Sequence, residues 1–143
     1  MKKLFIIFFV LVCVWSLSAQ TSTKLPVNIA NWKGQDSDKI LKNATVKSRL
    51  KKLLGKKNYA DFLESWETLN PISKKGNFLF SSGCLIHACG HAESAIAIDL
   101  GTKTIHVGIF REGERTRFFN EKRRSTPKVI SSWARRLIAN SKE

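Results

Sequence analysis

The stretch 95–111 reads AIAIDLGTKTIHVGIFR. Apolar side chains alternate with others on both sides of Gly101 and Thr102, and this two-residue period is typical of β-strands. A two-residue loop at Gly101-Thr102 would place the branched apolar side chains of both strands on one face, whereas a shift by one residue would separate them. The stretch therefore predicts a hairpin of strands 95–100 and 104–111. The pairs that this register predicts are Ile98 with Ile105 and Ile96 with Val107.

Strands on either side extend this hairpin into a meander. Residues 77–82 form a strand that leads into a cysteine-containing loop, and residues 114–120 follow a second turn at Glu112-Gly113. A two-residue loop there predicts Val107 opposite Phe118 and Ile109 opposite Thr116. The other face is mixed, and we expect it to be half exposed or covered by the N-terminal arm. Its members are Ala97, His106, Phe110, Arg115, Arg117 and Phe119.

Helical periodicity precedes the sheet and follows it. A first helix is predicted from Ser37, with Asp36 or Ser37 as its cap, to Gly55. A second is predicted over 58–69, before Asn70-Pro71. The apolar stripes of these helices are Ile40, Leu41, Ala44, Leu50, Leu53 and Leu54 in the first, and Tyr59, Phe62, Leu63 and Trp66 in the second.

A third helix is predicted to start near Ser125-Thr126-Pro127, with Thr126 as its cap. Its buried stripe would be Ile130, Trp133, Ala134, Leu137 and Ile138. The fold class is therefore α+β: an antiparallel meander flanked by two N-terminal helices and one C-terminal helix, in a single domain over 37–143.

The N-terminus predicts export. Lys2 and Lys3 precede an apolar run that is too short to span a bilayer, and small residues follow it up to Ala19, as in a secretory signal peptide over 1–19. Cleavage near Ala19 would place the protein in the periplasm or outside the cell. Residues 20–36 would then form an N-terminal arm, in which Val27, Ile29 and Trp32 pack on the domain.

Charge is the second compositional signal. The full chain of 143 residues has 25 basic and 11 acidic side chains, and loss of Lys2 and Lys3 with the signal peptide leaves a formal net charge of +12. The excess is concentrated in 39–57 and 111–136. Such a charge favours anionic partners such as envelope lipids or lipopolysaccharide, although it is also compatible with a merely solvated surface. Export removes the chain from most nucleic acid.

The loop 84–89 reads CLIHAC and offers three kinds of chemistry. Because export leaves Cys84 and Cys89 as an even pair, a disulfide is the default, and it would hold His87 in a small ring. With His87 and His91 the same cysteines could instead bind zinc, although so tight a cluster would be strained. A Cys–His nucleophile is the third alternative, but an oxidised cysteine is no thiolate. We predict no metal, no cofactor and no enzyme activity.

The residues Leu85, Ile86 and Ala88 around His87 are apolar. Apolar side chains on a constrained, exposed loop indicate a contact surface. The alternative is that the loop folds inward and Ile86 fills the core.

The segment SGCLIHAC at 82–89, followed by an alternating apolar strand, resembles the inhibitor of vertebrate lysozyme family. The resemblance covers about 77–111 and departs from the family at Ala88, where a polar or acidic residue is frequent. It implies a Cys84–Cys89 disulfide and a loop, Leu85 to Ala88, that enters the active-site cleft of lysozyme or another glycan hydrolase. His87 would meet the catalytic carboxylates there. The alternative function is a basic module that binds anionic lipid or lipopolysaccharide.

Overall fold

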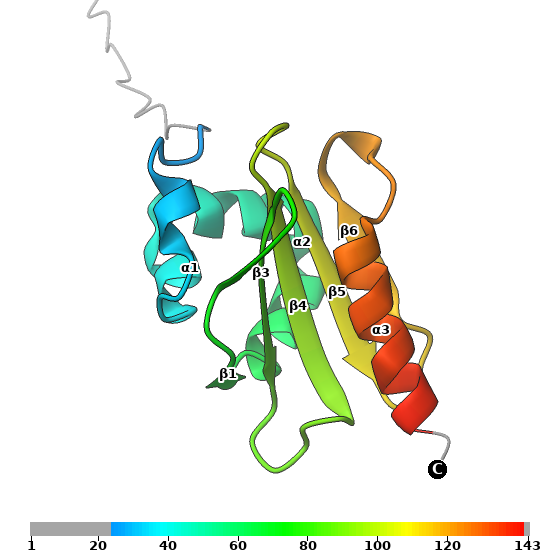
Figure 1. Ribbon diagram of the computed structural model, residues 1–143. Helices are drawn as coiled ribbons and strands as arrows, with labels where there is room; N and C mark the ends of the chain where they lie inside the picture. Colours follow the sequence, from blue (N-terminus) through cyan, green and yellow to red (C-terminus); the bar gives the residue numbers. More distant parts are fainter. Residues whose placement is uncertain (1–23, 142–143) are drawn as a thin grey trace, which may run out of the picture.

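The computed structural model describes residues 24–141 (Figure 1). The predicted signal peptide, its cleavage near Ala19 and the first residues of the predicted arm lie outside this range. Within it, no helix is long and apolar enough to cross a membrane.

The centre of the fold is an antiparallel six-stranded sheet in the order β1-β3-β4-β5-β6, with β2 also paired to β3. Its strands are β1 Thr68–Leu69, β2 Ser73–Lys75, β3 Phe78–Cys84, β4 Ala92–Asp99, β5 Ile105–Arg111 and β6 Arg117–Asn120. The helices are α1 Asp38–Lys42, α2 Ala44–Glu64 and α3 Lys128–Asn140, and short 3₁₀ turns occur at η1 Ile29–Trp32 and η2 Glu121–Arg123. The predicted α+β fold class, with two helices before the sheet and one after it, is confirmed.

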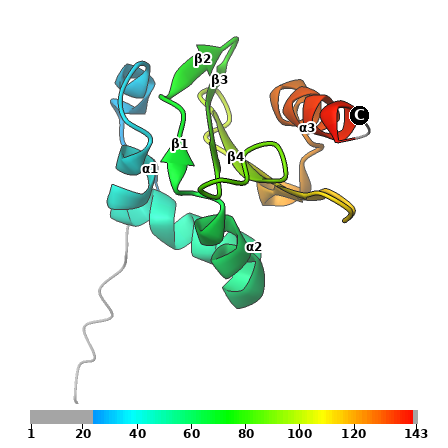
Figure 2. The same ribbon diagram turned by 90° about the horizontal axis from the view of Figure 1, so that it is seen from below.

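Helices cover both faces of the sheet, as the view from below shows (Figure 2). On one face, the branched side chains of β4 and β5 pack against η1, α1 and α2 in the larger core. On the other face, Phe80, Ala97 and Phe110 pack against Trp133 and other side chains of α3. Since β4 and β5 are buried on both faces, the sheet is a rigid support for the loops at its ends.

The first predicted hairpin register is confirmed, because Ile98 pairs with Ile105 and Ile96 with Val107. The second is wrong by one residue, since Val107 pairs with Phe119 and Ile109 with Arg117. This register leaves three residues, 112–114, in the turn, where Gly113 has a φ of 77°. Such a three-residue turn with a left-handed glycine is a common hairpin connection. Phe119 therefore packs against the larger core and Phe118 is exposed.

Three predicted helix features need correction. The first helix is interrupted at Asn43, whose side chain caps α2 by accepting a hydrogen bond from the Val46 amide at 3.0 Å. Gly55, with a φ of 68°, does break the helix as predicted, but the following turns end at Glu64 rather than residue 69. Thr126 does not cap α3; its hydroxyl accepts a hydrogen bond from the Asn120 side chain instead.

The N-terminal arm contributes to the larger core. Ile29 and Trp32 are buried as predicted, together with Leu25, but Val27 is fully exposed. The arm lies on the side of α1 and α2, whereas α3 covers the mixed face of the sheet. Our expectation that the mixed face is half exposed or covered by the arm is therefore wrong for Ala97, His106 and Phe110.

Candidate target-binding loop

The loop between β3 and β4 leaves the sheet at Cys84 and returns at Ala92, at one end of the molecule (Figure 1). A disulfide joins Cys84 to Cys89, with their Cα atoms 5.0 Å apart. Cys84 is buried at the end of β3, whereas Cys89 is exposed. The bond therefore attaches the far side of the loop directly to the sheet.

His87 lies at the tip of a tight turn inside this ring. The Ala88 amide donates to the Leu85 carbonyl at 2.9 Å, and His87 has a φ of 62°. A positive φ at the third residue is the geometry of a type II turn, and histidine enters this left-handed region more readily than most residues. His87 is exposed at this position.

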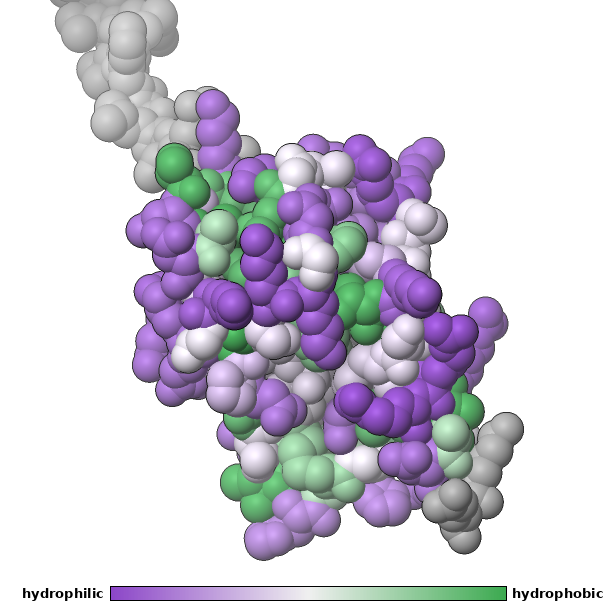
Figure 3. All heavy atoms as spheres, viewed as in Figure 1, coloured by the Kyte–Doolittle hydropathy of each residue, from purple (hydrophilic) through white to green (hydrophobic). Residues whose placement is uncertain are grey.

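The turn presents its side chains to solvent. His87 is exposed and Ile86 is 53% exposed, so the alternative in which Ile86 fills the core is wrong. Leu85 and Ala88 are half-buried. Among residues 24–141, none forms a hydrogen bond or ion pair with the His87 ring. Hydrophobic residues are exposed among hydrophilic ones at this lower end of the molecule (Figure 3). The turn thus offers one free imidazole beside an apolar side chain.

Two carboxylates hold the loop backbone on either side of the turn. Glu67, just before β1, accepts a hydrogen bond from the Ile86 amide at 3.1 Å, and Glu93 in β4 accepts one from the Gly90 amide at 2.9 Å. The Leu85 amide also donates to the Ala92 carbonyl at 3.0 Å. Sequence reasoning missed both glutamates. Glu67 has no recognisable signal, because β1 places it beside the loop and a strand of two residues is invisible to periodicity.

His91 lies outside the ring and is already engaged. Its Nδ1 contacts the Glu112 carboxylate, and its carbonyl accepts a hydrogen bond from the Glu112 amide at 2.8 Å. These contacts attach the end of the loop to the turn between β5 and β6. Of the two exposed histidines at this end of the molecule, only His87 is therefore free.

The other chemistries that the cysteines suggested do not match this geometry. Both sulfur atoms are in the disulfide, so neither is a thiolate that could attack a substrate or bind zinc. No group of three or more potential ligand side chains is arranged around a metal position within the described part of the chain. His106 is buried in β5, where Asn120 and Thr104 satisfy its two ring nitrogens at 2.9 and 3.1 Å.

A short loop that is closed by a disulfide and fixed to a rigid sheet is typical of proteins that bind a target with a preorganised loop. The model of the family described as inhibitor of vertebrate lysozyme (Ivy) matches residues 45–143, and the chain belongs to this family. It is a family of inhibitors rather than of catalysts, and its target is lysozyme. Comparison with curated proteins and with solved structures gave no match.

Proposed function

We propose that the protein inhibits a vertebrate lysozyme by inserting the β3–β4 loop into the active-site cleft of the enzyme. The observation that carries this proposal is His87: an exposed imidazole at the tip of a disulfide-closed turn, with no hydrogen-bond or ion-pair partner among residues 24–141. Family membership supports lysozyme as the target.

The chemistry of the turn suits a cleft that contains carboxylates. An imidazole N–H donates a hydrogen bond to a carboxylate, and such charge-assisted bonds are about twice as strong as neutral ones. A protonated ring has two donors and a positive charge. Ile86, 53% exposed, would lose its apolar surface to the cleft wall at the same time. Together these contacts block the substrate position without any covalent step.

Rigidity favours binding. Ordering a flexible loop on association costs roughly 0.5–1.5 kcal/mol for each immobilised side chain. The disulfide, the turn hydrogen bond and the two glutamates fix the loop before the target arrives. Most of the ordering cost is therefore met on folding rather than on binding.

Export is part of the proposal. The sequence pattern of residues 1–19 and the disulfide both fit an oxidising compartment outside the cytoplasm. We place the mature protein in the periplasm or outside the cell, where it could meet lysozyme.

Charge complementarity at the loop offsets the net charge of the chain. Vertebrate lysozymes are basic, so a mature protein with a net charge of +12 is repelled at long range. Three carboxylates nevertheless border the loop, those of Glu67, Glu93 and Glu112. Electrostatic interactions between exposed charges more than about 8 Å apart are screened at physiological salt. The family favours this protein target over the anionic envelope material considered above.

A cell-wall lysis assay with a vertebrate lysozyme tests the proposal. The wild-type mature chain is expected to inhibit, and His87→Ala to weaken inhibition by roughly 30-fold or more, the effect of losing a binding hot spot of about 2 kcal/mol. Asn31→Ala is the control, because it truncates an exposed side chain of η1, outside the loop, and should change inhibition by less than about threefold. Absence of inhibition by the wild type, or equal effects of the two variants, would contradict the proposal.

A further inference from the structure

A second feature lies at the end of the sheet opposite the loop. An open cavity of about 1180 Å³ is bordered by the N-terminal arm, α2, Lys103 of the turn between β4 and β5, and residues 120–123. The eight residues of β4 separate this end from the β3–β4 loop, which corresponds to roughly 25 Å. A ligand here could bind without contact with His87.

The cavity has an apolar part. Leu25, Pro26 and Val27 of the arm and Leu53 of α2 line it. Val27 is fully exposed, whereas Leu25 is buried and Pro26 and Leu53 are half-buried. These side chains offer a surface for an alkyl chain.

The remainder of the wall is cationic. Its five exposed cations are Lys24, Lys52, Lys103, Lys122 and Arg123, and within residues 24–141 none forms an ion pair with a carboxylate. The one carboxylate of the wall, Glu121, is engaged by the Arg49 guanidinium and by the Ile105 amide, which donates to it at 2.8 Å. The positive charge of the cavity is therefore uncompensated.

Backbone strain is concentrated at the same place. Four non-glycine residues of the described chain have a positive φ; one is His87, and the others are Lys103, Lys122 and Arg123, with φ of 56°, 53° and 52°. A left-handed conformation costs an ordinary residue roughly 1–2 kcal/mol, and such residues cluster at binding sites. These three positions therefore mark the wall as a candidate binding site.

We propose that this cavity binds a single-chain anionic amphiphile, with its alkyl chain on the apolar side chains and its phosphate or carboxylate head group among the cations. Small-ligand sites combine an apolar lining with a few polar groups that fix orientation. A free inorganic anion would use only the cationic part, and a neutral amphiphile only the apolar part. A ligand with both an alkyl chain and an anionic head group matches the apolar and the cationic part of the cavity together.

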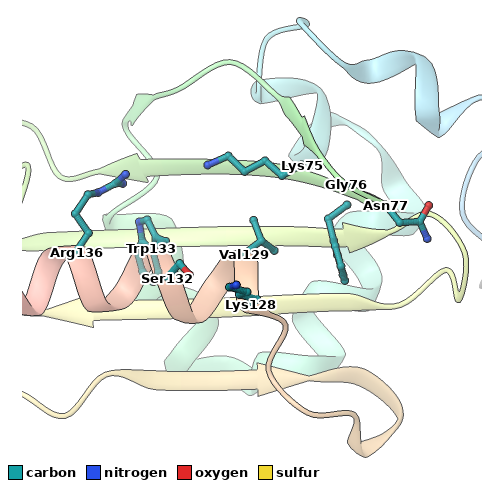
Figure 4. A pocket seen from close by; sticks show the side chains of 9 residues that line it. Lys75, Gly76, Asn77, Lys128, Val129, Ser132, Trp133 and Arg136 are labelled. Carbon is teal, nitrogen blue, oxygen red and sulfur yellow. The ribbon is translucent and has the colours of Figure 1, made fainter.

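A second hollow is less suited to this role. It measures about 460 Å³ and lies between α3 and the hairpin at Lys75–Asn77 (Figure 4). Its Trp133 is only 3% exposed, and the Lys75 ammonium already lies 4.5 Å from the centre of the Phe80 ring. Its apolar lining is buried at Trp133 and half-buried at Phe78 and Val129, whereas the larger cavity has the fully exposed Val27.

Calorimetric titration of the mature chain with dodecyl phosphate, below its micelle concentration, tests the proposal. Dodecyl phosphate is expected to bind at least tenfold more tightly than dodecyl maltoside or inorganic phosphate. Lys52→Gln with Lys122→Gln should weaken binding at least tenfold. Lys56→Gln with Lys57→Gln removes the same charge from exposed positions of α2 outside the cavity and should leave binding within about twofold.

Each other outcome would overturn the proposal. An equal loss of affinity for dodecyl phosphate in the two double variants would indicate a nonspecific effect of net charge. Equal affinities for dodecyl phosphate and dodecyl maltoside would indicate a purely apolar site. Binding to phosphatidylglycerol vesicles without binding of the monomeric amphiphile would indicate a membrane surface instead. His87→Ala is expected to leave the affinity for dodecyl phosphate unchanged. A loss of affinity in this variant would indicate that the amphiphile binds at the loop rather than in the cavity.

Discussion

Trp133 Nε1 donates a hydrogen bond to Glu93 Oε2 across 3.2 Å, while Glu93 Oε1 accepts one from the Gly90 amide. One side chain of β4 thus connects the indole of α3 to the backbone of the loop that carries His87. The helix that covers the sheet also steadies the loop.

Glu93→Gln should therefore weaken lysozyme inhibition without unfolding the protein. Trp133 and Gly90 donate to different oxygens of Glu93, and glutamine has an NH2 group in place of one of them, so one donor would lose its acceptor at a cost of about 1–3 kcal/mol. We expect inhibition to weaken several-fold in the lysis assay. Glu114→Gln is the control, with the same charge change at an exposed turn position. If both variants inhibit like the wild type, the connection does not contribute to binding.

Removal of the disulfide should affect inhibition more than folding. Loop-closure entropy for so short a ring is about 2 kcal/mol, and the hydrogen bonds from Ile86 and Gly90 remain. Cys84→Ser with Cys89→Ser is expected to keep the native circular dichroism spectrum, to lower the unfolding free energy by about that amount and to weaken inhibition at least tenfold. Mass spectrometry of the wild type before and after reduction should show a shift of about 2 Da; no shift would mean free thiols.

Gly108→Ala should destabilise the packing of α3 on the sheet. A Cβ at this position of β5 would lie 2.5 Å from Cζ3 of Trp133 and 3.2 Å from Cγ2 of Ile130. Both neighbours are buried, so the helix must shift, at a cost of about 1–3 kcal/mol. Urea unfolding measures the loss. Gly113→Ala is not a suitable control because of its positive φ, so Ser132→Ala on the exposed face of α3 is compared instead and should change the unfolding free energy by less than about 0.5 kcal/mol.

The register of β6 can be tested by two adjacent substitutions. Phe119 packs against the larger core, whereas Phe118 is 40% exposed. Phe119→Ala is expected to lower the unfolding free energy by about 2–3 kcal/mol and Phe118→Ala by less than about 1 kcal/mol. The reverse order would restore the register that the sequence predicted.

The turn between β4 and β5 should contribute pH-dependent stability. Burial raises the pKa of Asp99, but hydrogen bonds from Thr102 and Gly101 and the charge of His106 outweigh it, so the pKa lies below its ordinary value of 3.8. The stabilisation is therefore complete above pH 3.8 and is lost as the pH falls through the lower pKa of the folded state. The unfolding free energy of the Asp99→Asn variant should fall less steeply than that of the wild type as the pH is lowered through this window. If the acid unfolding curves of the variant and the wild type are identical, Asp99 does not contribute to the pH dependence of stability.

The elements that the sequence predicted are those in which periodicity and burial agree. β4 and β5 are buried on both faces, and they alternate because branched side chains face the larger core whereas alanine, histidine and phenylalanine lie on the α3 side. The stripe of α3 is complete except for Ile138, which is 37% exposed. β1 and β2 escaped prediction because strands of two and three residues have no period and form only by pairing with β3.

At the candidate site, local chemistry was predictable and tertiary contacts were not. Oxidation in an exported chain suggested the pairing of Cys84 with Cys89, and the structure contains that bond. Glu67 and Glu93 come from other segments, so only the folded chain brings them to the loop. The role of His87 toward a target remains our proposal.

The burial of Ile29 and Trp32 against α1 and α2 has a practical consequence. The family match starts at residue 45, and a recombinant fragment cut at that position would lack both side chains and Ile40 as well. Its exposed apolar groove would favour aggregation, and a failed inhibition assay with such a fragment would report on truncation rather than on biology. Expression should therefore begin at or before Leu25.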